Sequence, residues 1–134
     1  MKTGYLVLIL ACLVSCSPTL PTYDVKFSGN TIQVPTTGFD NSSFNVVHDP
    51  NAAFDILLIK KSPLAYEAYY LKCTFDQKAL DPTPEQIVCP VCASIYDFDG
   101  TVKKAPAETG LAKFQTELNA DQTLVTINIE ALGL

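Results

Sequence analysis

Short runs of apolar or alternating apolar and polar residues follow one another along most of the chain. Such runs are typical of β-strands, and clusters of Gly, Pro, Asn, Asp, Ser and Thr separate them at 28–30, 36–38, 49–51, 81–84 and 99–100. No window has a long helical period, and there is no internal repeat. The pattern predicts one small all-β domain, an antiparallel sandwich or barrel. Its strands are expected within 23–29, 30–35, 44–47, 54–61, 66–73, 86–90, 94–98, 101–104, 111–118 and 123–132.

Two hairpins are predicted from the turn residues between these runs. Residues 114–129 read as one hairpin, with Asn119 to Gln122 as its loop. Residues 97–104 read as a second hairpin, with Asp99-Gly100 placed for a tight primed turn. The segment 109–118 has some helical character, but its alternating apolar and polar residues also support a strand.

The first residues carry a targeting signal rather than part of the fold. One lysine, Lys2, precedes an apolar run from Tyr5 to Val14, which is too short to span a bilayer and fits a secretory signal. Residues 13–16, Leu-Val-Ser-Cys, resemble the lipobox of bacterial lipoproteins. The resemblance implies a signal peptide at 1–15, a Cys16 acylated after cleavage, a linker over 16–22 and the β domain over 23–134. Acyl chains on Cys16 would anchor the protein to the membrane of the bacterial cell envelope, facing the periplasm.

Charge and residue content exclude several function classes. The chain has a formal net charge of −5 and no arginine, so a nucleic-acid partner is not expected. It has no nucleophile–His–acid set, no glycine-rich phosphate loop and no HExxH motif, and we therefore expect no enzymatic activity. His48 is the only histidine.

Three cysteines remain once Cys12 leaves with the signal peptide and Cys16 is lipidated. In an oxidising compartment, Cys73, Cys89 and Cys92 suggest either one disulfide with a spare thiol or three metal ligands. A thioredoxin-like dithiol at Cys89 and Cys92 is disfavoured, because a strand rather than a helix is predicted after it. A structural zinc site needs four ligands, and His48 or Asp76 would have to be the fourth, so zinc is disfavoured as well.

The segment 55–129 resembles the cluster-binding half of Rieske [2Fe–2S] domains. Two motifs carry the resemblance, Cys-Thr-Phe at 73–75 and Cys-Pro-Val-Cys-Ala-Ser-Ile-Tyr-Asp at 89–97. A turn at Asp99-Gly100, a loop at Pro106-Ala107 and a closing hairpin from residue 111 follow in the family's order. The resemblance implies a Rieske-like β fold with two cluster-type loops.

The chain departs from this family at the iron ligands. The resemblance assigns Cys73 and Cys89 to one iron, but Phe75 and Cys92 stand at the two histidine positions. With one histidine in the chain, a two-histidine cluster cannot form within it. Ser94 and Tyr96 match residues that hydrogen-bond the cluster in respiratory members of the family.

Two further positions differ, because Lys78 and Val91 replace the cysteines that join the two loops in many members of the family by a disulfide.

Two hypotheses follow. In the first, the domain has lost its cluster, a disulfide joins the loops, and Phe75 fills the vacated space. The resemblance implies a Cys73–Cys89 disulfide, but Cys92 could also be the partner of either cysteine. The protein then serves as a structural or interaction module of an envelope complex. In the second, Cys73, Cys89, Cys92 and a fourth ligand, Asp76 or His48, hold an altered [2Fe–2S] cluster, and the protein carries electrons to a partner in a redox chain.

Overall fold

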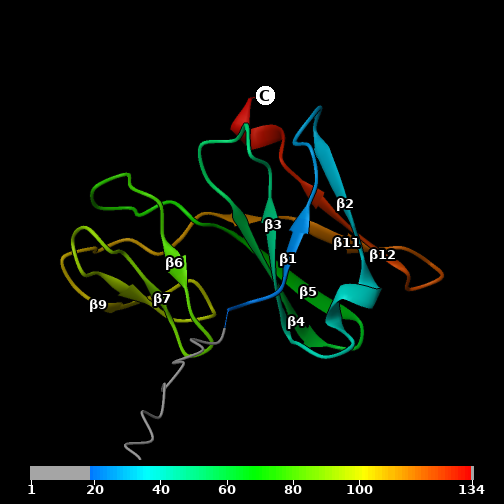
Figure 1. Ribbon diagram of the computed structural model, residues 1–134, viewed down its shortest axis with the longest axis horizontal. Coiled ribbons are helices and arrows are strands. Elements are labelled where there is room, and N and C mark those ends of the chain that lie inside the picture. Colours follow the sequence, from blue (N-terminus) through cyan, green and yellow to red (C-terminus); the bar gives the residue numbers. More distant parts are fainter. Residues whose placement is uncertain (1–18, 134) are drawn as a thin grey trace, which may run out of the picture.

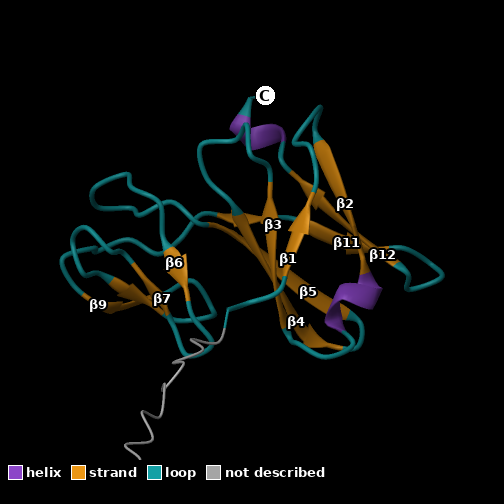
Figure 2. Cartoon of the chain, in the orientation of Figure 1, coloured by secondary structure: helices purple, strands orange, loops and turns teal. Residues whose placement is uncertain are grey.

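The computed structural model describes residues 19–133, which form three β-sheets (Figures 1 and 2). The largest sheet has the order β1 (Thr22–Asp24), β3 (Phe44–His48), β4 (Ile56–Ser62), β5 (Ala65–Tyr70) and β10 (Lys113–Phe114). The second has the order β11 (Thr116–Leu118), β12 (Leu124–Asn128) and β2 (Thr31–Pro35). The third has the order β6 (Asp81–Pro82), β7 (Ile87–Val88), β8 (Ile95–Tyr96) and β9 (Val102–Lys104). Two short 3₁₀ helices complete the elements, η1 (Thr36–Phe39) and η2 (Glu130–Leu132).

Strand β4 shows how the largest sheet comes to be buried on both faces. Successive side chains of a strand point to opposite faces, and four consecutive residues at the start of β4 are buried. Ile56 and Leu58 face one apolar cluster, whereas Leu57 and Ile59 face another. The continuous apolar run in the sequence is therefore the mark of a strand between two cores.

The first cluster, here called the sandwich core, lies between the largest sheet and the three-stranded sheet. Its buried members are Phe27, Ile32, Val34, Phe39, Val47, Ile56, Leu58, Tyr66, Ala68, Phe114, Val125, Ile127 and Ile129. The chain passes between the two sheets at Gln115, because β10 pairs with β5 and β11 pairs with β12. The predicted strand over 111–118 is thus two short strands in different sheets.

The second cluster, here called the loop core, lies between the other face of the largest sheet and the four-stranded sheet. Its buried members are Val46, Leu57, Ile59, Tyr69, Leu71, Cys73, Leu80, Ile87, Cys89, Tyr96, Ala107 and Leu111. The strands of this sheet are only two or three residues long, and β6, β7 and β9 lie at the left of Figure 1. Two of the three sequence-predicted cysteines therefore belong to this core.

The predicted all-β sandwich is confirmed, and the described residues contain no closed barrel. All strand pairs are antiparallel except β1 with β3. The hairpin predicted within 114–129 is confirmed as β11 and β12, with the Gln122 amide donating to the Asn119 carbonyl in its loop.

The hairpin at residues 97–104 forms, but its predicted primed turn is wrong. A type I′ turn needs positive φ at both central residues, whereas only Gly100 has it here, at +81°. The Gly100 amide donates to the Asp97 carbonyl, and the Asp97 amide donates to the Thr101 carbonyl. The loop therefore spans Asp97 to Gly100, and the register of β8 and β9 shifts beside it.

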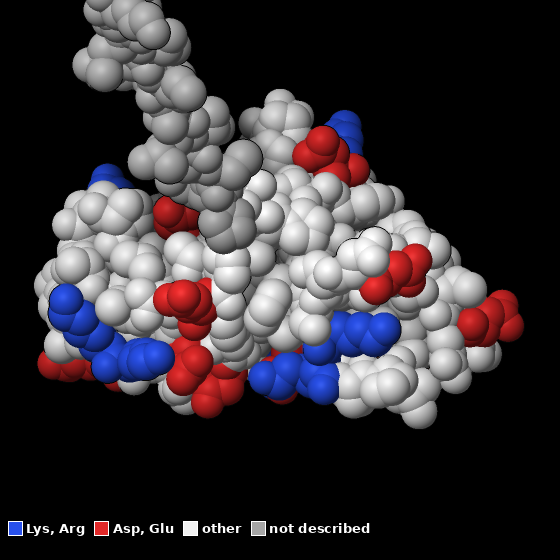
Figure 3. Space-filling model, turned by 60° about the horizontal axis from the view of Figure 1, so that its bottom comes forward, with Lys and Arg blue, Asp and Glu red and all other residues white. Residues whose placement is uncertain are grey.

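The predicted signal peptide at 1–15 and the lipidation site Cys16 lie outside the described residues. Between residues 19 and 133, no helix is long and apolar enough to cross a membrane. On the face shown in Figure 3, lysine and acidic side chains lie interspersed.

Candidate metal centre

The candidate site is built from two loops, one after β5 in the largest sheet and one after β7 in the four-stranded sheet. Past the end of β5, Leu71 and Cys73 are both buried in the loop core. Cys89 follows β7, where Ile87 and Cys89 are buried in the same core. Local strand geometry therefore points both cysteines into the space between the sheets.

The two loops, 73–78 and 89–94, have the same backbone hydrogen-bond pattern and are here called the twin loops. In the first, the Gln77 amide donates to the Cys73 carbonyl at 3.1 Å, and the Cys73 amide donates to the Lys78 carbonyl at 2.8 Å. In the second, the Ala93 amide donates to the Cys89 carbonyl at 3.0 Å, and the Cys89 amide donates to the Ser94 carbonyl at 2.8 Å.

The twin loops also share a left-handed residue at the same position. Gln77 has a φ of 62° and Ala93 a φ of 64°. Neither is glycine, so each loop holds an unfavourable backbone conformation in order to turn back on its own cysteine.

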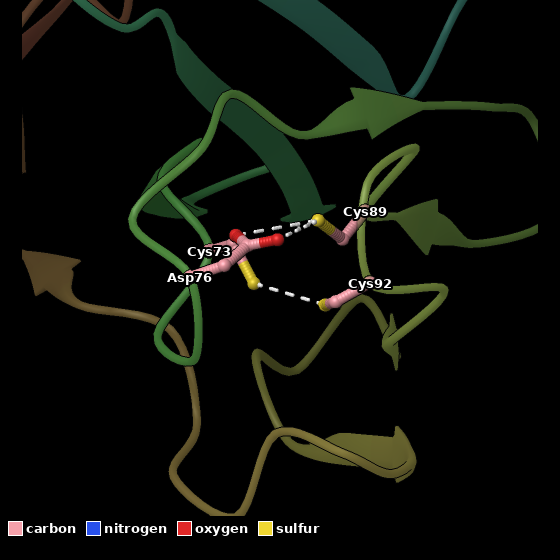
Figure 4. A group of neighbouring side chains, drawn as sticks. All are labelled: Cys73, Asp76, Cys89 and Cys92. Atoms are coloured by element: carbon pink, nitrogen blue, oxygen red, sulfur yellow. Dashed lines mark hydrogen bonds between the residues drawn. The ribbon is translucent and has the colours of Figure 1, made fainter.

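Four ligand atoms converge between the twin loops (Figure 4). The sulfur atoms of Cys73, Cys89 and Cys92 and a carboxylate oxygen of Asp76 all lie within 4.8 Å of one another. Cys73 and Cys92 approach to 3.7 Å between their sulfurs. The Cys89 thiol donates to the Asp76 carboxylate, at 3.4 and 3.5 Å from its two oxygens. The structure therefore brings together all four residues predicted as ligands.

Burial makes the Cys89 thiol hard to ionise in the absence of a metal. Removal from water raises the pKa of Cys89 to about 11, although the backbone amides of Cys92 and Val91 act in the opposite direction. A bound cation would reverse this effect, because it stabilises the thiolate directly.

Cys92 is partly exposed, and Ser94 stabilises its thiolate. The Ala107 amide donates to the Ser94 hydroxyl oxygen at 2.9 Å, which leaves the hydroxyl proton free for the Cys92 sulfur at 3.0 Å. Burial alone would raise the pKa of Cys92, but the hydrogen bonds from Ser94 and its backbone amide, together with those to Cys89 and Cys73, outweigh it. The pKa of Cys92 therefore lies below its ordinary value.

Tyr96 supports the other side of the site. Its hydroxyl lies 3.4 Å from the Cys73 sulfur and accepts from the Thr74 amide at 3.1 Å. The Thr74 hydroxyl donates to the Thr109 carbonyl at 2.6 Å and lies 2.9 Å from the Tyr96 oxygen. Ser94 and Tyr96 are fully buried, and each lies within hydrogen-bonding distance of a cysteine sulfur. Their role beside a cluster stays a prediction.

The Asp76 carboxylate stays ionised beside the thiols. Burial opposes ionisation, but the Lys78 amide donates to it at 3.1 Å, and the three neighbouring thiols add further hydrogen bonds. The pKa of Asp76 is therefore lower than usual. An anionic oxygen held among three sulfurs is a suitable metal ligand.

Two other residues considered for this site from the sequence, Phe75 and His48, lie outside it. The expectation that Phe75 fills the space of a lost cluster is wrong, because its side chain is 58% exposed. His48 is not part of the group, since its Nδ1 lies 2.8 Å from an Asp55 oxygen.

Cys73, Cys89 and Cys92 are free thiols in the structure. The Cys73–Cys89 disulfide stays a prediction for the oxidised protein.

Sequence reasoning missed the equivalence of the twin loops, although a signal was present. Asp76 follows Cys73 by the same three positions that separate Cys92 from Cys89. Thr74 and Ala107 were noted only as parts of the family motifs, and nothing in the sequence indicated that their backbone amides hold the Tyr96 and Ser94 hydroxyl groups.

Comparison with known proteins assigns the chain to no family. No protein-family model matches it, and a search of the curated proteins gives no match either.

Proposed function

We propose that this chain is a lipid-anchored protein of the bacterial cell envelope whose Rieske-like β domain carries a thiolate-rich metal centre. The observation that supports the metal centre is the convergence of Cys73, Asp76, Cys89 and Cys92, with ligand atoms within 4.8 Å of one another. Three sulfurs and one carboxylate favour iron or zinc over magnesium or calcium, which prefer oxygen ligands.

Binding at this position joins two segments that are far apart in sequence. A metal ion would link the end of β5 to the end of β7, across a loop core whose small sheet has very short strands. Because the ligands are assembled by the fold, the metal-binding free energy adds to the stability of the folded state. With iron the centre would also carry electrons, and with zinc it would be structural.

The metal centre is tested on the full chain, exported by a bacterial host and purified without chelator or reductant. Metal content is measured by inductively coupled plasma mass spectrometry, and free thiols by mass spectrometry after alkylation. Bound iron or zinc with all three thiols of the domain reduced is the expected result. A metal-free protein that also fails to take up metal after reduction contradicts the proposal.

The lipid anchor is tested separately by replacing its acylation site. Cys16→Ser should move the protein from the membrane fraction to the soluble fraction, because one or more acyl chains supply the membrane affinity. Equal partitioning of the variant and the unchanged chain would contradict lipidation at this residue.

A metal-free module held together by a disulfide is the second candidate. It is favoured by the 3.7 Å separation of the Cys73 and Cys92 sulfurs, which could close to a bond of about 2.05 Å in an oxidising compartment. The family resemblance implies Cys73 with Cys89 instead, and peptide mapping of the purified protein distinguishes the two pairings. In this form the protein would act through a partner in an envelope complex.

A further inference from the structure

We infer that the twin loops bind one tetrahedral thiophilic ion, of the class of Zn²⁺ or Fe²⁺, and that Asp76 serves as the fourth ligand. This inference rests on the proposed metal-binding function, and it excludes the two-iron cluster that the Rieske resemblance implies. The evidence for it is the set of distances between ligand atoms and the backbone hydrogen-bond pattern that the two loops share.

The measured separations match the edges of a tetrahedron around one ion. Metal–sulfur bonds of about 2.3 Å at tetrahedral angles place two sulfurs about 3.8 Å apart. A sulfur and an oxygen bound at about 2.1 Å then lie about 3.6 Å apart. Cys73 and Cys92 are 3.7 Å apart, and Cys89 lies 3.4 and 3.5 Å from the Asp76 oxygens.

The other pairs of ligand atoms would have to move only slightly to reach tetrahedral distances. All of them lie within 4.8 Å. Closing to a tetrahedral edge of about 3.8 Å therefore requires movements of about 1 Å or less. Asp76 and Cys92 are only partly buried, so their side chains have room to make this movement.

The pairing follows an approximate two-fold relation between the twin loops. Each loop supplies its first and fourth residues, Cys73 and Asp76 from one and Cys89 and Cys92 from the other. The first residue of each loop contacts the fourth residue of its twin, Cys73 with Cys92 and Cys89 with Asp76. Two loops that each contribute a ligand pair at this spacing form a closed four-ligand site, as in structural zinc centres.

A two-iron cluster would need a different arrangement. The resemblance places Cys73 and Cys89 on one iron and Cys92 on the other, so Cys73 and Cys92 would lie at opposite ends of a sulfide-bridged pair of irons. In the structure these two sulfurs are instead at the separation of two ligands on the same ion. Phe75, at the other histidine position, is exposed and has no ligand atom to offer.

Binding of a divalent metal ion releases the protons of the cysteine thiols. A divalent ion replaces the protons of the three thiols, which pass to solvent, and Asp76 binds as the carboxylate. The resulting site carries two negative charges, from three thiolates, one carboxylate and one divalent cation. Ser94 and Tyr96 lie within hydrogen-bonding distance of the Cys92 and Cys73 sulfurs and can stabilise this charge.

The first test is stoichiometry. The full chain is purified from a bacterial host without chelator, and its iron, zinc and acid-labile sulfide are measured per chain. One metal ion without sulfide is expected. Two irons with two sulfides would overturn the inference while leaving the proposed metal-binding function standing. If the chain takes up no metal, even after reduction, both fail.

The second test identifies the ligands with Co²⁺, whose visible spectrum reports tetrahedral geometry and thiolate ligation. The reduced, metal-free chain should saturate at one Co²⁺ and show sulfur-to-cobalt charge-transfer bands. Asp76→Asn should weaken Co²⁺ binding at least about tenfold. Asp76→Cys should restore tight binding and intensify the charge-transfer bands, because a fourth thiolate replaces the carboxylate.

Asp121→Asn is the matched control, since Asp121 is an exposed aspartate in the loop between β11 and β12. It should bind Co²⁺ as the unchanged chain does. If Asp76→Asn behaves like this control, and Asp76→Cys leaves the spectrum unchanged, Asp76 is not a ligand and the twin-loop assignment is overturned. Saturation at two Co²⁺ ions per chain would also overturn it.

Discussion

Ser94 positions the Cys92 sulfur through a hydroxyl group that the backbone itself holds in place. Its oxygen accepts from the buried Ala107 amide, and its proton is left for Cys92. In Ser94→Ala the Ala107 amide loses its partner in a buried position, which should cost about 1–3 kcal/mol of unfolding free energy. Urea denaturation of the metal-free, reduced protein measures this loss.

Ser28→Ala serves as the control for this change, because Ser28 is exposed. It should alter the unfolding free energy by less than about 0.5 kcal/mol. If Ser94→Ala costs no more than the control, the hydrogen bond from Ala107 is not important for stability.

Cys92 should be the most reactive of the three thiols in the metal-free protein. Its lowered pKa means that a larger fraction is thiolate at a given pH, whereas the buried Cys89, with a pKa of about 11, remains protonated through neutral pH. Alkylation with iodoacetamide between pH 6 and 9, followed by peptide mass spectrometry, should label Cys92 before Cys89 at every pH. Equal labelling of the two residues, or labelling of Cys89 first, would contradict this prediction.

At the scale of elements, the turn between β8 and β9 depends on a glycine for two reasons. Gly100 has a φ of +81°, and a Cβ at this position would lie 2.5 Å from the Tyr69 ring. That ring is buried and its hydroxyl donates to Glu67, so it cannot easily move away. Gly100→Ala should therefore cost about 2–4 kcal/mol of unfolding free energy, measured by urea denaturation.

Gly29→Ala separates backbone strain from steric clash. Gly29 also has a positive φ, of +68°, but a Cβ there would meet nothing within 4 Å. It should cost only about 1 kcal/mol, the penalty of the left-handed conformation. Equal losses for the two variants would show that the contact with Tyr69 does not matter.

The pattern of apolar residues predicted most of the strands but not how they are shared among sheets. It missed β6, because Asp81 and Pro82 were read as part of a turn, whereas they pair with Val88 and Ile87. Alternation reports which residues face a core, and this identified β2, β5 and β12. It does not report the partner strand, so the passage from β10 to β11 between two sheets was read as one strand. The Asp-Gly pair marked a turn correctly, but its type depends on φ values that residue identity alone does not fix.

The candidate site could be predicted only where residue type restricted the chemistry. Three cysteines in a short chain are conspicuous, and all three meet in the structure. The sequence left the fourth ligand open between Asp76 and His48, because an aspartate on a loop is usually solvated. The structure places Asp76, and not His48, among the three cysteines. Phe75 was misplaced, because an apolar side chain was assumed to be buried.

At the scale of the whole molecule, the two cores differ in what holds them together. The sandwich core is enclosed by strands of up to seven residues, including β4 and β12. The loop core is covered on one side by the four-stranded sheet, whose strands are only two or three residues long. Two of its buried members are Cys73 and Cys89. A metal bound by these cysteines should therefore stabilise the loop core more than the sandwich core.

Hydrogen–deuterium exchange before and after metal removal measures this difference. The amides of Cys73 and Cys89 donate to carbonyls within the twin loops, so they should exchange at least about tenfold faster once a chelator has removed the metal. Peptides covering 31–35 and 124–128, both in the three-stranded sheet, should change little, because their buried residues belong to the sandwich core alone. Uniform acceleration across both cores would mean that the metal supports the whole domain as one cooperative unit. Unchanged exchange in the twin loops would mean that the fold alone holds the four ligands together.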